Sequence, residues 1–227
     1  MKKKAIIVSI KGAKLSQKEK MLLSKEKPWG LILFKRNIQS LKQIKKLIID
    51  IKKITKDKKF PIMIDEEGLI VSRLSKIINH RINANFFGNL YEIDRNIALK
   101  LYCSYLNSLC KILRVIGINI NTIPVLDILR KNTNKIIGKR SFSHDKKTVK
   151  QLGIATIKKC HSNNIATVIK HVPGHGCSTA DSHLSMPKVN LSTTELNNKD
   201  FYPFKISSAK LAMTAHILYS KIDPKNV

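Results

Sequence analysis

Short runs of apolar residues alternate with longer segments of helical periodicity along the whole chain. Each short run is continuously apolar, as expected for a parallel β-strand that is covered on both faces. Such runs occur at residues 5–10, 31–34, 61–65, 118–121, 167–171 and 211–215. The repeated strand–helix–strand order predicts a parallel α/β sheet, either a closed barrel or an open doubly wound sheet.

Three of the segments between these runs have the three- and four-residue apolar spacing of amphipathic helices. The first covers residues 41–51 and carries lysines on its opposite face. The second covers residues 97–116 and stops at Gly117, a residue suited to ending a helix. The third is expected to begin after Asp145, whose carboxylate can cap a helix N-terminus. Helices in these positions would connect and cover the predicted strands.

Composition places the protein among globular chains. Its 227 residues are 43% hydrophobic and show no internal repeat, linker or composition break, so we expect one domain over residues 1–227. No apolar run approaches the roughly 20 residues of a membrane-spanning helix, and the run at residues 5–10 is too short for a signal peptide. The four cysteines form no CxxC pair, which favours reduced thiols. We therefore expect a cytoplasmic protein without a membrane partner.

The net charge of +28 raises the question of a polyanionic partner such as nucleic acid. Nucleic-acid-binding domains usually concentrate basic residues in a patch and interleave them with aromatic residues. Here the lysines are spread along the predicted helix faces, and aromatic residues make up only 6% of the chain. This distribution favours a solvated basic surface, with nucleic acid bound only nonspecifically if at all.

Polar residues capable of chemistry cluster directly after four of the predicted strands. They lie at residues 65–68, 124–127 and 171–183 and at His216. The carboxyl ends of parallel strands meet at one end of a barrel or one edge of an open sheet, which is where such folds build active sites. The pattern therefore indicates an enzyme-like site.

The densest cluster is the segment KHVPGHGCSTADSH at residues 170–183. In an extended segment Asp181 and His183 project to the same side, so the carboxylate could orient the imidazole as a general acid/base. The alternative is a loop in which Asp181 caps backbone N–H groups. Lys170 either holds a polar ligand or extends its ammonium group into solvent.

A metal site is a further alternative for the same segment. Its ligands would be His171, His175, Asp181 and His183. The proline and glycines between these residues do not impose the regular ligand spacing of a zinc motif, and the cysteines offer no zinc site. The chain also lacks a P-loop and a GxGxxG loop. The spacing therefore disfavours a metal site without excluding it.

Two other segments carry candidate ligand-binding residues. In IDEEGLIVSRL, Asp65 could accept hydrogen bonds from sugar hydroxyls and Arg73 could hold a polar substituent. The alternative is that the acidic residues begin the next helix, where they would suit the helix dipole. In IGKRSFSHD, Arg140 is either a ligand-binding group or a surface arginine beside Phe142.

Six segments occur in the order GLILFKRNI, IDEEGLIVSRL, NINTIPVLDI, IGKRSFSHD, KHVPGHGCSTADSH and MTAHILYSKID. Together they resemble glycoside hydrolase family 3, and within it the bacterial cytoplasmic β-N-acetylhexosaminidases. The resemblance covers essentially the whole chain. The resemblance implies an incomplete (β/α)8 TIM-barrel type of α/β fold, with about six of the eight strand–helix units present. It also implies a terminal β-linked N-acetylglucosamine residue of cell-wall muropeptides as the substrate, with no metal and no cofactor.

The resemblance further implies a retaining two-step mechanism through a covalent glycosyl-enzyme. In it, His183 is the general acid/base and Asp181 orients His183, a departure from the usual pair of carboxylates. The positions that bind the sugar match Asp65, Arg73, Arg140, Lys170 and His171.

The chain departs from the family pattern at several positions. Gly68 stands alone where the family has two glycines and an arginine, and Ser143 replaces a glycine. The nucleophilic aspartate of the family lies in a Ser-Asp-Asp-Leu-like segment that residues 1–227 do not contain, and Asp223 matches a different position. We therefore expect a domain truncated before its nucleophile and inactive alone. It would be a sugar-binding remnant, or one half of an enzyme completed by a second polypeptide.

Overall fold

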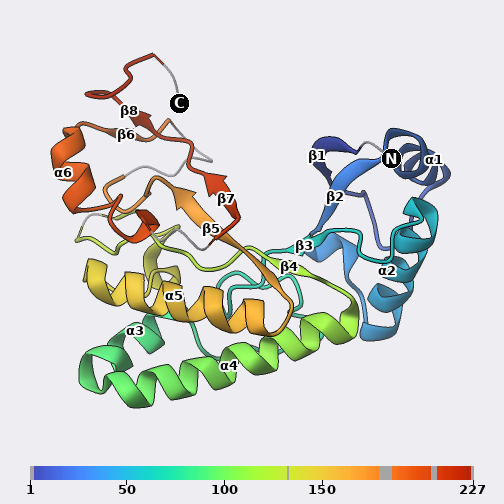
Figure 1. Cartoon of the computed structure of the whole chain (residues 1–227), viewed down its shortest axis with the longest axis horizontal. Helices are drawn as coiled ribbons and strands as arrows, with labels where there is room; N and C mark the ends of the chain where they lie inside the picture. The colour runs from blue at the N-terminus through green and yellow to red at the C-terminus, as the bar shows by residue number, and fades with distance from the viewer. Residues whose placement is uncertain (1–2, 132, 179–185, 206–208, 226–227) are drawn as a thin grey trace.

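A curved parallel sheet forms the centre of the molecule (Figure 1). The computed structural model describes residues 3–131, 133–178, 186–205 and 209–225. The strands of the main sheet, in spatial order, are β1 (Lys4–Val8), β2 (Pro28–Leu33), β3 (Ile62–Ile64), β4 (Ile120–Asn121), β5 (Ala166–Val172) and β7 (Leu211–Thr214). A separate parallel pair consists of β6 (Lys188–Val189) and β8 (Leu218–Tyr219). All six predicted strands are therefore confirmed, with bounds that differ by a few residues.

Helices follow most strands of the main sheet. They are α1 (Gln17–Glu26), α2 (Leu41–Thr55), α3 (Ala84–Ile93), α4 (Arg95–Ile116), α5 (Lys146–Ser162) and α6 (Thr193–Asn198). The three predicted helices correspond to α2, α4 and α5. Gly117 ends α4 with a φ of 102°, and Asp145 caps α5 by accepting hydrogen bonds from two backbone N–H groups. Within the described residues, no helix has the length and apolar character that crossing a bilayer requires.

The apolar pattern does not predict α1, α3 and α6. Only Leu23 is buried in α1, so the sequence of this helix lacks the periodic apolar pattern that predicts a helix. Its start is fixed instead by a capping box between Ser16 and Glu19. The same motif, formed by Ser192 and Glu195, starts the short helix α6. Capping therefore determines elements that apolar periodicity leaves undefined.

The two faces of the main sheet are packed differently, because successive side chains of a strand point to opposite faces. On the outer face, Ile64 and Ile169 belong to a large apolar cluster with residues of α2, α4 and α5. On the inner face, Met63, Ile120 and Val168 form a much smaller cluster with half-buried neighbours. The helices thus complete the outer face only.

Strands β1 and β7 are the two edges of the sheet, since within the described residues each pairs with a single neighbour. Exposure is high along β1, where Ile6 is 52% and Ile7 is 40% exposed. A barrel closes when its first and last strands are joined through further strands. The six strands therefore form an open half-barrel, which confirms the predicted incomplete fold of the TIM-barrel type.

Candidate functional site

The inner face of the sheet changes from apolar to ionic at its carboxyl end. Met63 and Val168 belong to the inner apolar cluster, and two residues further along the same face lie Asp65 and Lys170. A cavity of about 440 Å³ opens beside these charges. Its lining includes all five predicted binding residues, Asp65, Arg73, Arg140, Lys170 and His171, together with Glu67, His175 and His216.

Asp65 lies at the centre of one group of contacts in this cavity. Its Oδ2 accepts a hydrogen bond from Arg73 Nη2 at 3.0 Å, and its Oδ1 accepts one from the Thr122 hydroxyl at 2.5 Å. Lys170 Nζ lies 3.6 Å from Oδ1. Burial opposes ionisation, but Lys170, Thr122 and Arg73 together hold the pKa of Asp65 below its usual range. Asp65 is therefore a charged acceptor that its neighbours hold in place.

Glu67 is a site residue that the sequence does not single out. Arg140 donates from Nε and Nη2 to its two oxygens at 2.8 and 2.9 Å, and Lys170 Nζ lies 2.5 Å from Oε1. Burial opposes ionisation of Glu67, but Lys170 and Arg140 hold its pKa below the usual range. The Lys170 side chain is 2% exposed and the Arg140 side chain 11%. The alternatives of a solvated lysine and a surface arginine are therefore wrong.

The acidic run also does not begin a helix, because the next helix starts only at Ala84. Glu66 is fully buried, and it accepts hydrogen bonds from the backbone N–H groups of Arg73 at 2.9 Å and Leu74 at 2.8 Å. Its other oxygen lies 2.7 Å from His80 Nε2. The helix-dipole alternative is therefore wrong, and Glu66 instead fixes the loop that carries Arg73.

His171 is oriented by Asp127, which follows β4. The distance between His171 Nδ1 and Asp127 Oδ2 is 2.6 Å, and Asp127 Oδ1 accepts a hydrogen bond from the His175 backbone N–H at 2.7 Å. Burial opposes ionisation, but the neighbouring His171 and His175 hold the pKa of Asp127 below its usual range. Burial also lowers the pKa of His175, and its Nδ1 has no partner among the described residues. This nitrogen is itself buried, so it is an unsatisfied polar atom within the described residues.

Two glycines let the loop after β5 pack tightly. Gly174 has a φ of 139°, and a Cβ there would lie 2.9 Å from the Asp200 carbonyl oxygen. A Cβ at Gly176 would lie only 2.2 Å from the carbonyl oxygen of Ile128. Asp200 also accepts a hydrogen bond from the Cys177 backbone N–H at 2.7 Å. These contacts anchor the first part of the loop to residues outside the sheet.

The positions that depart from the family pattern are accommodated locally. Gly68 has a φ of 144°, and a Cβ there would approach the Ile82 carbonyl oxygen to 2.9 Å, so the remaining glycine occupies a position that requires one. The Ser143 hydroxyl donates to Glu92 at 2.6 Å and accepts from the Asp145 backbone N–H at 2.9 Å. The serine thus replaces a glycine without an unsatisfied hydroxyl.

The predicted acid/base pair, Asp181 and His183, lies outside the described residues. Two of the four ligands of the alternative metal site are these same residues. In the part of the chain that the structure describes, no group of three or more His, Cys, Asp or Glu side chains is placed to hold a metal ion.

The charged groups of the site balance one another. Asp65 and Glu67 form ion pairs with Arg73, Arg140 and Lys170, while Asp127 pairs with His171. With Asp127 included and the histidines counted as neutral, these charges sum to zero in a chain with a net charge of +28.

Comparison with known proteins shows the family to which the chain belongs. The sequence matches the Glycosyl hydrolase family 3 N terminal domain over residues 2–227. A Beta-hexosaminidase of Neisseria meningitidis and one of Haemophilus influenzae are 31% and 32% identical to it, over 97% and 96% of this chain and 62% of each relative. The crystal structure of native NagZ from Neisseria gonorrhoeae superposes with a TM-score of 0.92 and 30% identity, over 99% of this chain and 66% of that one.

Two other structures of gonococcal NagZ contain N-trifluoroacetyl-D-glucosamine and a zinc ion. Both have a TM-score of 0.91, with identities of 30% and 29%, and cover 97% and 99% of this chain and 66% of that protein. This chain spans 62% of the length of the curated relatives named above. The family match nevertheless extends over nearly all of its residues, and the fold agrees with that of gonococcal NagZ. The chain belongs to glycosyl hydrolase family 3.

Proposed function

We propose that the chain binds a terminal β-linked N-acetylglucosamine residue of a cell-wall saccharide in the cavity beside Asp65 and Lys170. The observation that carries this proposal is the convergence of all five predicted binding residues on one cavity of about 440 Å³. A site whose donors and acceptors are held by ion pairs suits an uncharged sugar, whose hydroxyls both donate and accept. Family membership and the N-trifluoroacetyl-D-glucosamine complex of gonococcal NagZ support the ligand class.

The ionic contacts would act by holding the binding groups in place before the sugar arrives. Asp65 accepts hydrogen bonds from hydroxyl groups, while Lys170 and Arg73 donate to hydroxyl or acetamido oxygens. Because the side chains are already ordered by their buried partners, binding costs less conformational entropy.

In the proposed chemistry, His183 is the acid/base of a retaining β-N-acetylhexosaminidase and Asp181 orients it. His183 donates a proton to the glycosidic oxygen while a carboxylate attacks the anomeric carbon, and in the second step it takes a proton from the incoming water. No segment of residues 1–227 matches the one that carries the attacking aspartate in the family. We therefore propose that this chain alone binds the sugar without cleaving it, in the cytoplasm and without a metal.

A second candidate is that the chain is one half of an enzyme completed by another polypeptide. The observation that favours it is the pair of open edges, β1 and β7, on either side of a partly exposed inner face. A polypeptide that supplies further parallel strands would pair with both edges and could bring the missing carboxylate. Co-purification that restores sugar hydrolysis would support this candidate over a sugar-binding remnant.

Calorimetry with free N-acetylglucosamine tests the proposed function. We expect the unmodified chain to bind, and D65N to bind at least about tenfold more weakly, because a charged acceptor contributes about 1.5–3 kcal/mol. D57N is the matched control, since Asp57 pairs with Lys3 at the surface, away from the cavity. An absence of heat with the unmodified chain, or equal affinities for D65N and D57N, would overturn the proposal.

A further inference from the structure

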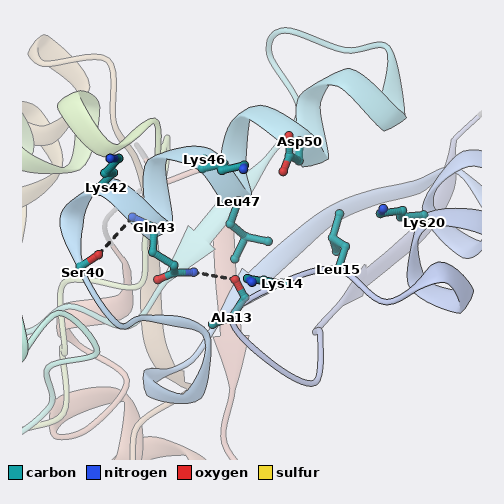
Figure 2. Close-up of a pocket in the computed structure, with 10 residues that line it drawn as sticks. All are labelled: Ala13, Lys14, Leu15, Lys20, Ser40, Lys42, Gln43, Lys46, Leu47 and Asp50. Carbon is teal, nitrogen blue, oxygen red and sulfur yellow. Dashed lines mark hydrogen bonds between the residues drawn. The ribbon is translucent and has the colours of Figure 1, made fainter.

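A second cavity, of about 450 Å³, lies between α1, α2 and the segment that follows β1 (Figure 2). None of its lining residues lines the cavity beside Asp65. Segment 13–15 and Lys20 of α1 form one wall, and residues 40–50 at and along α2 form the other. The cavity is therefore a separate concave feature that the proposed sugar chemistry does not use.

The charge around this cavity is strongly one-sided. Four lysines line it, Lys14, Lys20, Lys42 and Lys46, against a single acidic residue, Asp50. Among the described residues none of these five side chains makes an ion pair, whereas Lys3, Lys4 and Lys170 do. Four ammonium groups without counter-ions around a hollow favour an anionic occupant.

Phosphate is the anion that best matches a lining with several lysines. Lysine acts as a compact point charge and is a common phosphate ligand. A phosphate group carries more negative charge and more acceptor oxygens than a carboxylate, so it suits four lysines and one carboxylate better. The charged lining therefore favours phosphate groups.

The floor of the cavity is apolar and its walls are tied together. Figure 2 shows Lys14 and Lys20 on either side of Leu15, with Lys46, Leu47 and Asp50 facing them from α2. Leu47 is 3% exposed and Leu15 is half-buried. The Gln43 side chain joins the walls, because its Nε2 donates to the Ala13 carbonyl oxygen at 2.7 Å. The cavity thus offers a fixed apolar surface between its charges.

We propose that this cavity binds a small ligand of the nucleotide class, with phosphate groups on the lysines and an apolar or aromatic body against Leu15. The carboxylate of Asp50 accepts a hydrogen bond from an amino or hydroxyl group of that body. A volume of about 450 Å³ lies within the range of about 300–1,000 Å³ that is usual for small-molecule sites.

Calorimetric titration of the full chain with ATP tests this site. We expect K14Q and K46Q each to weaken ATP binding about tenfold, because each removes a charge-assisted hydrogen bond to phosphate. K100Q and K111Q are matched controls, since both lysines are exposed on α4 and form no ion pair within the described residues. No binding of ATP, or an equal loss in the control variants, would overturn the proposal, because the second result is expected from the net charge alone.

The apolar part of the ligand is tested with L15N and two further probes. We expect L15N to weaken ATP binding while leaving inorganic tripolyphosphate binding unchanged, and adenosine alone to bind weakly. Equal effects of L15N on ATP and tripolyphosphate would contradict a role for the floor and overturn the nucleotide class. Binding of N-acetylglucosamine by K46Q should match that of the unmodified chain, so this site and the sugar site can fail independently.

Discussion

The two faces of the main sheet differ in what buries their side chains. On the outer face, apolar side chains such as Leu33 and Ile64 are fully buried under α2, α4 and α5. On the inner face, Ile32 stays half-buried beside Met63, and the strands then end in paired charges. The outer face is a fully buried hydrophobic core. The inner face is partly exposed except at the strand ends, where ion pairs bury its residues.

Most of the stability therefore comes from one face of the sheet, and the candidate site lies on the other. The outer cluster removes the most apolar surface from water, so it supplies most of the driving force for folding. Lys170 and Glu67 instead bury charge at the carboxyl end of the inner face, which costs desolvation and is tolerated only because each group has partners. We therefore expect the inner ionic layer to be sensitive to the loss of any one partner.

The largest expected effect comes from removing the charge of Glu67. E67Q leaves Lys170 and Arg140 without their shared carboxylate, and we expect it to lower the free energy of unfolding by about 3–5 kcal/mol. E26Q is the matched control, because Glu26 pairs with Lys4 at the surface and its loss should have no measurable effect. Urea unfolding of both variants measures the difference, and equal stabilities would show that the ionic layer is solvated.

A smaller effect should distinguish the two faces within one strand. Leu33 and Ile32 are neighbours in β2, but Leu33 is fully buried in the outer cluster and Ile32 is half-buried on the inner face. We expect L33A to lower the free energy of unfolding by about 3 kcal/mol and I32A by about 1 kcal/mol, both measured by urea unfolding. Equal costs would mean that the inner face is covered in solution, for example by a second copy of the chain.

The smallest effect should be a dependence of stability on acid pH. The folded-state pKa values of Asp65, Glu67 and Asp127 lie below their usual range, so these carboxylates stabilise the fold fully above their unfolded pKa values of about 3.9–4.3. This stability is lost as the pH falls through the lowered folded-state values. We expect the free energy of unfolding to decrease below about pH 4, and to decrease less steeply in E67Q. Identical pH profiles would contradict the assigned role of Glu67.

Most of the outer layer could be predicted from the sequence. Continuous apolar runs and three- and four-residue spacing identify the six strands and the helices α2, α4 and α5. The same runs suggest strands covered on both faces, yet Ile6 and Ile7 are exposed in the edge strand β1. Local periodicity records which side chains are apolar, but it does not record whether a partner layer is present.

The candidate site could be predicted by residue type and position but not by pairing. Asp65, Lys170 and His171 stand at strand ends, where a parallel sheet concentrates functional groups. The role of Glu67 depends on the turn at Gly68, which brings it opposite Arg140, 73 residues further along the chain. Such a contact has no local signal, although the burial cost of three successive acidic residues after an apolar strand is a hint that they need partners.

Incubation of the purified chain with an aryl N-acetyl-β-glucosaminide tests the central claim most directly, because that claim is binding without cleavage. We predict that the chain releases no more aryl alcohol than H183A does, while N-acetylglucosamine still binds in calorimetry. Robust release with retained anomeric configuration, lost in H183A, would contradict the account, since it would require a nucleophile within residues 1–227.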